Sequence, residues 1–127
     1  MKKVISIILA ILFMASGFAF AGEKEKIAVA ANDKTPTASV SKQAGPSPFF
    51  LIFDGKGKLI ETIANPAKDS QNSGIAVADF LAGKGATVVV AEGFGPKIVE
   101  VMKGKGIKAV SFKGSAEEAV KKVLQAN

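Results

Sequence analysis

The chain has 127 residues, enough for one domain, and carries seventeen lysines, eleven acidic residues and no arginine, a net charge of +6. It contains no cysteine, histidine, tryptophan or tyrosine. These absences exclude a disulfide scaffold, a His/Cys zinc site, a cysteine-ligated iron–sulfur cluster and Ser-His-Asp or Cys-His catalysis. Any chemistry therefore depends on carboxylates, lysines, hydroxyls, amides and backbone groups.

Residues 1–21 have the pattern of a secretory signal peptide. Lys2-Lys3 is the positive start, Val4 to Met14 is an apolar run, and Ala19-Phe20-Ala21 is a small-residue cleavage site. A retained membrane anchor is the alternative, because the apolar run is borderline for a span. We expect cleavage after Ala21, since charged residues follow at once, and hence a periplasmic or secreted protein. Residues 22–127 would then form a single α/β domain with fifteen lysines, eleven acids and a net charge of +4.

The first half of this domain predicts three strands. Short apolar or alternating runs place them at 27–31, 49–53 and 59–63. Asp54-Gly55 is a turn that closes a hairpin between the second and third strands. The polar segments 34–48 and 67–72 are expected to be loops, and loops as long as the first are usually functional or disordered.

In the second half of the domain, the pattern predicts a helix followed by two strand–helix units. Ser73 is expected to cap a helix that ends by Gly83, and Pro96 to open a second helix that ends by Gly104. Strands are expected at 87–91 and 107–112. A last helix is expected to begin at a capping box formed by Ser115 and Glu118. The apolar spacing in the three helices predicts that the following side chains point inward: Val77, Phe80, Leu81, Ile98, Val101, Met102, Ala119, Val120, Val123 and Leu124.

The element order β-β-β-α-β-α-β-α predicts a mixed five-stranded α/β sheet. We expect strand order 3-2-1-4-5 with the second strand antiparallel, as in ribonuclease-H-like folds. Phe50, Phe53, Phe80 and Phe112 are expected in the core.

A ligand site is predicted where the strand order reverses, beyond the carboxyl ends of strands 27–31 and 87–91. Two helix starts, Ser73-Gly74 and Gly95-Pro96, should point there and offer free N–H groups to an anion. The alternative is a set of ordinary loops with glycine at tight turns. The candidate binding residues are Asn32, Lys42, Gln43, Gly45, Asn72, Ser73, Gly74, Gly93, Gly95 and Lys97.

Other readings of the polar residues are weaker. Gly93-Phe94-Gly95 lacks the third glycine of a dinucleotide fingerprint and the Gly-Lys-Ser/Thr ending of a P-loop. A two-metal nuclease would need two of Asp33, Asp54 and Asp79 to converge, whereas turn and surface positions suit them better. The lysines are spread along the chain with acids between them, so we expect a solvated surface and no nucleic-acid partner. Once the signal peptide is cleaved, we expect no membrane contact.

The sequence resembles the dinitrogenase iron–molybdenum cofactor biosynthesis family, of the NifX, NifB C-terminal and orange-protein type. The likeness runs from Lys26 to about Leu124. It is carried, in order, by Lys26-Ile27-Ala28-Val29-Ala30, Ser41…Gly45…Pro48-Phe49-Phe50-Leu51-Ile52, Asn65-Pro66-Ala67, Ser73-Gly74-Ile75, Gly95-Pro96 and Gly106-Ile107-Lys108.

The resemblance implies a small ribonuclease-H-like domain that binds or carries a metal–sulfur cluster and is not a nuclease. In this chain we expect no catalytic and no metal-ligating residues. One family member, an orange protein of sulfate reducers, holds a molybdenum–copper–sulfide cluster without covalent protein ligands. Here Gln43 stands where the family often has His, Pro46 where it often has Arg, and Asp69-Ser70-Gln71-Asn72 where it is commonly rich in histidine and glycine, so imidazole ligation is impossible.

We therefore expect an exported, non-catalytic protein that holds an anionic cluster, thiometallate or other small anion through backbone N–H groups, Gln43, Asn72, Ser73 and Lys97. The alternative is a protein-interaction module of the same fold that has lost cluster binding.

Overall fold

The structure, a computed structural model, describes residues 25–126. The predicted signal peptide lies outside these residues. Within them, no helix is both long and apolar enough to cross a membrane. The elements are β1 (Lys26–Ala31), β2 (Phe49–Asp54), β3 (Leu59–Ala64), α2 (Ser73–Gly83), β4 (Val88–Ala91), α3 (Pro96–Gly104), β5 (Lys108–Ser111) and α4 (Ala116–Gln125).

The five strands form one mixed sheet in the order β3-β2-β1-β4-β5, which confirms the predicted order. β2 is antiparallel to β1, with Lys26 opposite Asp54, whereas β4 and β5 run parallel to β1. The predicted strand 87–91 begins one residue later, and 107–112 is one residue shorter at each end. Because β1, β4 and β5 are parallel, the loops that follow them gather at one edge of the sheet.

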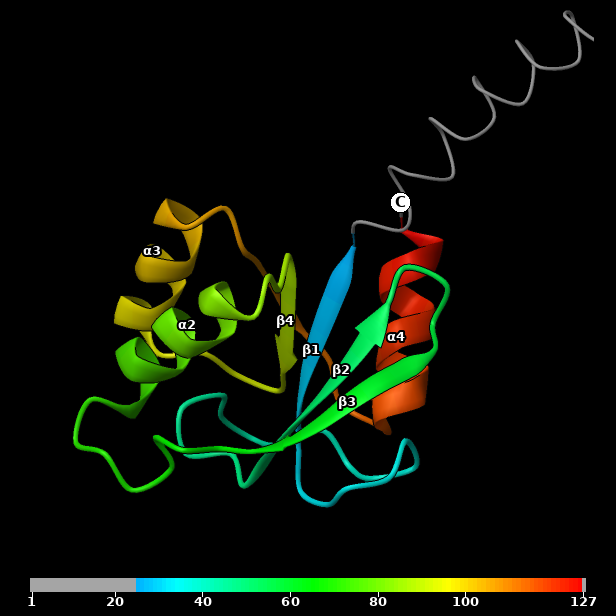
Figure 1. Cartoon of the computed structure of the whole chain (residues 1–127), viewed down its shortest axis with the longest axis horizontal. Coiled ribbons are helices and arrows are strands. Elements are labelled where there is room, and N and C mark those ends of the chain that lie inside the picture. Colours follow the sequence, from blue (N-terminus) through cyan, green and yellow to red (C-terminus); the bar gives the residue numbers. More distant parts are fainter. Residues whose placement is uncertain (1–24, 127) are drawn as a thin grey trace, which may run out of the picture.

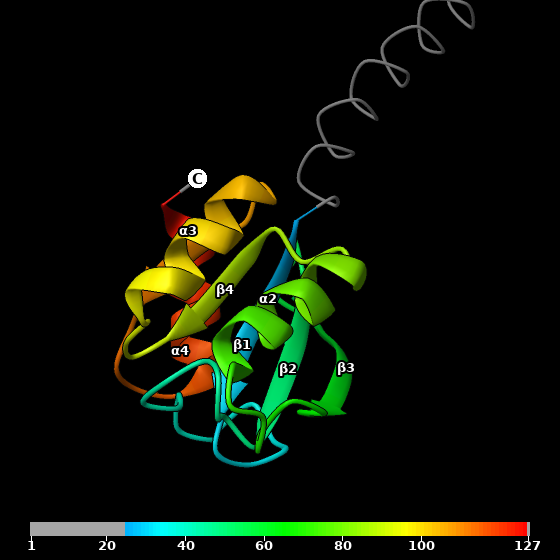
Figure 2. The same cartoon turned by 90° about the vertical axis from the view of Figure 1, so that its left-hand side faces the viewer.

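Helices cover both faces of the sheet, α2 and α3 on one side and α4 on the other (Figures 1 and 2). Alternate residues of β1 point to opposite faces, so Ala28 and Ala30 contact the α2–α3 layer while Ile27 and Val29 contact the α4 layer. The central strand is therefore buried on both sides, which accounts for its continuous apolar sequence.

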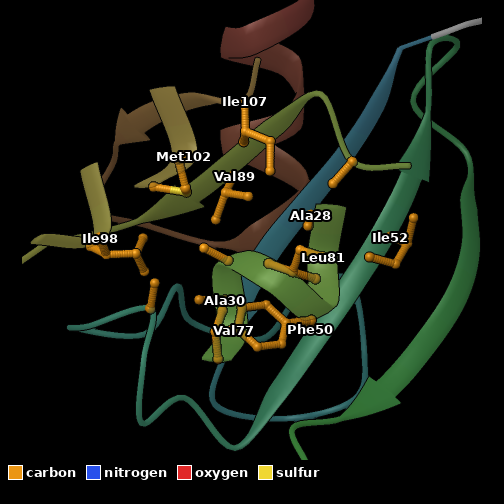
Figure 3. Close-up of a cluster of buried hydrophobic side chains, with 14 residues drawn as sticks. Ala28, Ala30, Phe50, Ile52, Val77, Leu81, Val89, Ile98, Met102 and Ile107 are labelled. Atoms are coloured by element: carbon orange, nitrogen blue, oxygen red, sulfur yellow. The ribbon is translucent and has the colours of Figure 1, made fainter. Parts of the chain in front are cut away.

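The core on the α2–α3 side holds the two helices whose starts form the site. Val77 and Leu81 of α2 lie over Phe50, and Ile98 and Met102 of α3 point toward the sheet (Figure 3). The prediction of core phenylalanines is confirmed for Phe50 and Phe53, which are fully buried, whereas Phe80 and Phe112 are half-buried and pack at the margins.

Asp54 organises the β2–β3 turn. Its Oδ1 accepts hydrogen bonds from the backbone N–H groups of Lys56 and Lys58, both at 2.9 Å. The Lys58 hydrogen bond is the main cause that lowers the pKa of Asp54 below its ordinary value of 3.8, against the opposing effect of partial desolvation. A carboxylate with a lowered folded-state pKa stabilises the fold above the unfolded pKa and loses that effect as the pH falls.

Asp54→Asn should therefore lower the thermal midpoint at pH 5 to 7, where the wild-type carboxylate is charged and accepts both hydrogen bonds. The gap should shrink as the pH falls from 3.8 through the lowered pKa of Asp54. Thermal melts followed by circular dichroism at pH 7, 5, 3 and 2 measure this gap. A gap of constant size across these pH values would contradict the assignment.

Candidate functional site

A cavity of about 390 Å³ opens at the edge of the sheet where β1 and β4 end. Three backbone segments surround it: the 43–46 segment, the start of α2 and the start of α3. Its lining residues are Gln43, Ala44, Gly45, Pro46, Gln71, Asn72, Ser73, Gly74, Ile75, Gly95, Pro96, Lys97 and Ile98.

The first turn of α2 presents unpaired N–H groups to the cavity. The N-cap residue is Asn72, not Ser73 as predicted, and its side chain makes no capping hydrogen bond. The first helical hydrogen bond runs from the Ala76 N–H to the Asn72 carbonyl, at 3.0 Å. Within residues 25–126, the N–H groups of Ser73, Gly74 and Ile75 therefore have no acceptor.

Ser73 is the first residue within α2 rather than its cap, and its side chain lies against another segment. The Ser73 Oγ lies only 2.6 Å from where a Cβ on Gly45 would sit. The hydroxyl thus packs on the 43–46 segment. The N-cap of α2 is Asn72, one residue before the serine that was predicted to cap the helix.

The first turn of α3 is open in the same way. Gly95 is the N-cap with extended backbone, Pro96 has no N–H, and the first bond back to the cap is a long 3.4 Å from the Val99 N–H to the Gly95 carbonyl. In the described residues the Lys97 and Ile98 N–H groups have no acceptor. Neither α2 nor α3 has an acidic residue in its first turn.

The start of α4, by contrast, is capped by side chains of the helix itself. The Ser115 hydroxyl accepts from the Glu118 N–H at 3.2 Å, and the Glu118 carboxylate accepts from the Ser115 N–H at 2.9 Å. That backbone hydrogen bond, with a second from the Ser115 hydroxyl, lowers the pKa of Glu118. The predicted capping box of α4 is thus confirmed, whereas the two helix starts at the cavity have no such carboxylate.

Two close backbone approaches hold the walls of the cavity together. A Cβ on Gly45 would come within 2.9 Å of the Gly74 nitrogen, and a Cβ on Gly74 would come within 3.3 Å of the Ile98 Cβ. Gly45 does not have a positive φ, so space and not backbone conformation requires glycine here. The 43–46 segment, α2 and α3 therefore touch through glycine positions.

Asn65, which the sequence analysis did not select as a site residue, fastens the 43–46 segment from below. It is only 7% exposed, and its Nδ2 donates to the carbonyls of Gly45 and Ser47, both at 2.8 Å. Its Oδ1 accepts from the Ala67 N–H at 2.9 Å. The only sequence signal for this role was its place before a proline at the end of a strand.

Lys97 brings positive charge to the cavity. It is the second residue of α3, its side chain is exposed, and it forms no hydrogen bond or ion pair with the part of the chain that the structure describes. A lysine in the first turn of a helix is disfavoured by the helix dipole. An anion in the cavity would offset that cost.

The structure brings seven of the ten candidate residues to the cavity, and places Asn32, Lys42 and Gly93 elsewhere. The Asn32 Oδ1 accepts from the Ser41 hydroxyl at 2.9 Å, and the Lys42 carbonyl accepts from the Gly93 N–H at 2.9 Å. Through these hydrogen bonds, residues 41 and 42 are held against the ends of β1 and β4. Six other residues line the cavity. Pro96 was predicted at the start of a helix that faces the site, and the residues that sequence reasoning missed are Ala44, Pro46, Gln71, Ile75 and Ile98.

The carboxylates do not converge as a two-metal site would require. Asp33 follows the end of β1, whereas Asp54 lies opposite Lys26 at the other end of that strand. Asp79 forms an ion pair with Lys105 at 2.8 Å. Among the described residues, no group of three or more acidic side chains is placed to hold a metal ion.

The comparisons with known proteins agree with this fold. The family model described as "Dinitrogenase iron-molybdenum cofactor" matches residues 25–126. The apo orange protein from Desulfovibrio gigas is similar at 27% identity and a TM-score of 0.75, covering 80% of this chain and 88% of that one. A NifB-like protein from Thermotoga shares the fold at 24% identity and a TM-score of 0.68, with the same coverage. No curated protein matches at a significant level. The chain therefore belongs to the dinitrogenase iron–molybdenum cofactor family.

Proposed function

We propose that this protein is an exported, non-catalytic carrier that holds an anionic metal–sulfur cluster or thiometallate in the cavity between α2, α3 and the 43–46 segment. The observation that carries the proposal is the pair of helix starts that line one cavity with five N–H groups unpaired within residues 25–126. Helix N-termini with free N–H groups favour anions, and here two of them act on one volume.

The donor set suits a cargo that brings its own metal ligands. The chain has no thiolate or imidazole, and no carboxylate of residues 25–126 lines the cavity. A thiometallate already carries sulfide ligands and negative charge, so it needs hydrogen-bond donors rather than ligand atoms. Removing such an anion from water is costly unless several donors converge on it, which the N–H groups, Gln43, Asn72 and Lys97 can supply.

Tetrathiomolybdate, added with and without copper(I) to the 22–127 domain, tests the proposal. We expect a change in the visible spectrum of the thiometallate and a rise in the thermal midpoint of the protein, because a ligand that binds only the folded state stabilises it. If neither the spectrum nor the thermal midpoint changes at high micromolar tetrathiomolybdate, cluster carriage is refuted.

Lys97→Glu should weaken that binding about tenfold or more, because it replaces a cation by an anion at a charge-assisted contact. The ligand-free domain should be equally stable or gain about 0.3–1 kcal/mol, since an acid suits the first turn of a helix. Titration by visible absorbance and urea unfolding measure the two effects.

Lys58→Glu is the matched control, since it makes the same charge change in the exposed β2–β3 turn at the other end of the sheet. It should leave thiometallate affinity within about twofold. Equal losses in the two variants would mean that Lys97 acts only through net charge.

Export to the periplasm or beyond is part of the same proposal and is supported by the signal-peptide pattern of residues 1–21. N-terminal sequencing of protein recovered from its host tests it. A mature chain that begins at Gly22 is expected.

A protein-interaction module is the second candidate function, favoured by two exposed apolar side chains near the cavity. Ile75 is 36% exposed in the first turn of α2, and Val99 is 39% exposed in the first turn of α3. Capture of a partner protein that is lost in Ile75→Ser/Val99→Ser, together with no response to tetrathiomolybdate, would favour this function over cluster carriage.

A further inference from the structure

The fold gathers lysines at the end of the domain opposite the cavity. Each helix follows a parallel strand or precedes one, so α2, α3 and α4 all end where β1, β4 and β5 begin (Figure 1). At these helix ends lie Lys84, Lys103, Lys105, Lys121 and Lys122.

The strands add four more lysines at the same end. Lys26 begins β1, Lys108 begins β5, and Lys56 and Lys58 lie in the β2–β3 turn. These pieces lie close together: the Lys26 Nζ donates to the Lys84 carbonyl at 3.0 Å, and a Cβ on Gly57 would lie 3.4 Å from the Leu124 Cδ1 of α4. We call these nine lysines and their surroundings the basic end.

The net charge of the described domain is concentrated there. The basic end has nine lysines. It has five carboxylates, with the mid-helix Glu100 included: Glu25, Asp54, Glu61, Asp79 and Glu100. The cavity end has equal numbers, with lysines 34, 42, 68, 97 and 113 and acids 33, 69, 92, 117 and 118. The basic end therefore carries +4 and the cavity end none.

Helix dipoles explain only part of this distribution. Lysines at the ends of α3 and α4 are favoured by the local dipole, and Lys84 and Lys105 are held in ion pairs with Glu61 and Asp79. Lys56, Lys58 and Lys108, by contrast, lie at strand ends with no helix terminus of their own. The helix dipoles therefore do not account for the positive charge that these three lysines add at this end, where the charges of Lys56 and Lys58 also act on the Asp54 carboxylate.

We propose that the basic end docks on an anionic phospholipid bilayer, with the cavity facing away from it. The chain enters the described domain at Glu25, at this end, and the apolar run Val4 to Met14 lies only a short segment before it in the sequence. A bilayer that holds this run during export, or afterwards if it is retained, thus meets the basic end first. Each lysine near an anionic membrane surface raises affinity about fivefold.

The sequence analysis expected no membrane contact once the signal peptide is cleaved, and it interpreted the lysines, which are spread among acids along the chain, as a solvated surface. Helices and strands of opposite direction bring lysines that are far apart in sequence to one end, and this gathering appears only in three dimensions.

Vesicle co-sedimentation of residues 22–127, which contain both hydrophobic clusters and all eight elements, tests the proposal without a leader. We expect binding to phosphatidylcholine vesicles with 30% phosphatidylglycerol at 50 mM NaCl, loss of binding at 300 mM NaCl, and none to pure phosphatidylcholine. The triple variant Lys103→Gln/Lys108→Gln/Lys121→Gln should bind about a hundredfold more weakly.

The control is Lys34→Gln/Lys68→Gln/Lys113→Gln, which removes the same charge from the cavity end and should bind within about threefold of wild type. Circular dichroism establishes whether each triple variant is folded. If the basic-end triple is not folded, the single variants Lys108→Gln and Lys121→Gln replace it, and each should bind about fivefold more weakly than wild type. Equal losses in the two triples, or no binding of wild type at 50 mM NaCl, would overturn the proposal.

The same assay separates a bilayer from a nucleic acid. If single-stranded RNA at equal phosphate concentration displaces the domain from the vesicles and binds more tightly at 150 mM NaCl, the basic end is a nucleic-acid surface and the bilayer proposal is wrong. Tetrathiomolybdate plays no part in these measurements, so their outcome is independent of that of the carrier proposal.

Discussion

Asn65→Ala is expected to destabilise the domain by about 2–4 kcal/mol, because it leaves two buried carbonyls without a donor and removes the acceptor of the Ala67 N–H. No other donor reaches the carbonyls of Gly45 and Ser47 within residues 25–126. Urea unfolding followed by circular dichroism measures the loss. The Ala67 N–H, which donates to the Asn65 Oδ1, should also lose amide-exchange protection.

Asn72→Ala is the matched control, since it makes the same substitution at the same cavity. Asn72 is exposed, and its side chain makes no capping hydrogen bond, so we expect a change within about 0.5 kcal/mol. Equal free energies of unfolding for the two variants would show that the Asn65 side chain does not fasten the 43–46 segment.

The fold was predictable because local signals along the chain agree with one another. The β-branched run before Ala91, Pro96 at a helix start and the Ser115–Glu118 capping box each specify one element without long-range information. Right-handed crossovers then leave few topologies for the strands, and the observed order is the one they favour.

The site was predictable in part, and the misses have a common cause. The two helix starts follow from local sequence, and the rule for open α/β sheets places them at one edge. The local sequence does not show that the N-cap of α2 is Asn72, or that the Ser73 hydroxyl lies beside Gly45, almost thirty residues earlier in the chain. Asn65 and the basic end likewise depend on segments brought together only by the fold, which periodicity and spacing do not report.

The carrier and bilayer proposals give the domain two functional ends. The cavity end has balanced charge overall, so its attraction for an anion comes from local N–H groups and Lys97 rather than from a general positive field. The basic end has the excess charge but no cavity lined by open helix starts. On these proposals a multivalent anion binds at the cavity, where donors converge, and the basic end contacts the bilayer.

Gly45→Ala should have the largest effect on the cavity itself. The new Cβ would lie 2.6 Å from the Ser73 Oγ, 2.9 Å from the Gly74 nitrogen and 3.2 Å from the Gly74 Cα. A hydroxyl can rotate away, but the helix backbone cannot, so the 43–46 segment must separate from α2. We expect a loss of about 1–3 kcal/mol in the free energy of unfolding, the usual cost of overpacking. Thiometallate affinity should fall more than tenfold, because the wall that brings Gln43 toward the open N–H groups is displaced.

Two further variants isolate the cause. Gly95→Ala changes the opposite wall, where nothing lies within 4 Å of the added Cβ and the backbone is extended, so its stability should change by less than about 0.5 kcal/mol. Gly45→Ala/Ser73→Ala removes the 2.6 Å contact but keeps the one with the Gly74 nitrogen, and should restore only part of the lost stability. Full restoration would mean that the hydroxyl alone requires glycine at position 45. Partial restoration, with affinity still low, is the result expected if the backbone of the 43–46 segment must touch the start of α2 for the two helix starts to face one cavity.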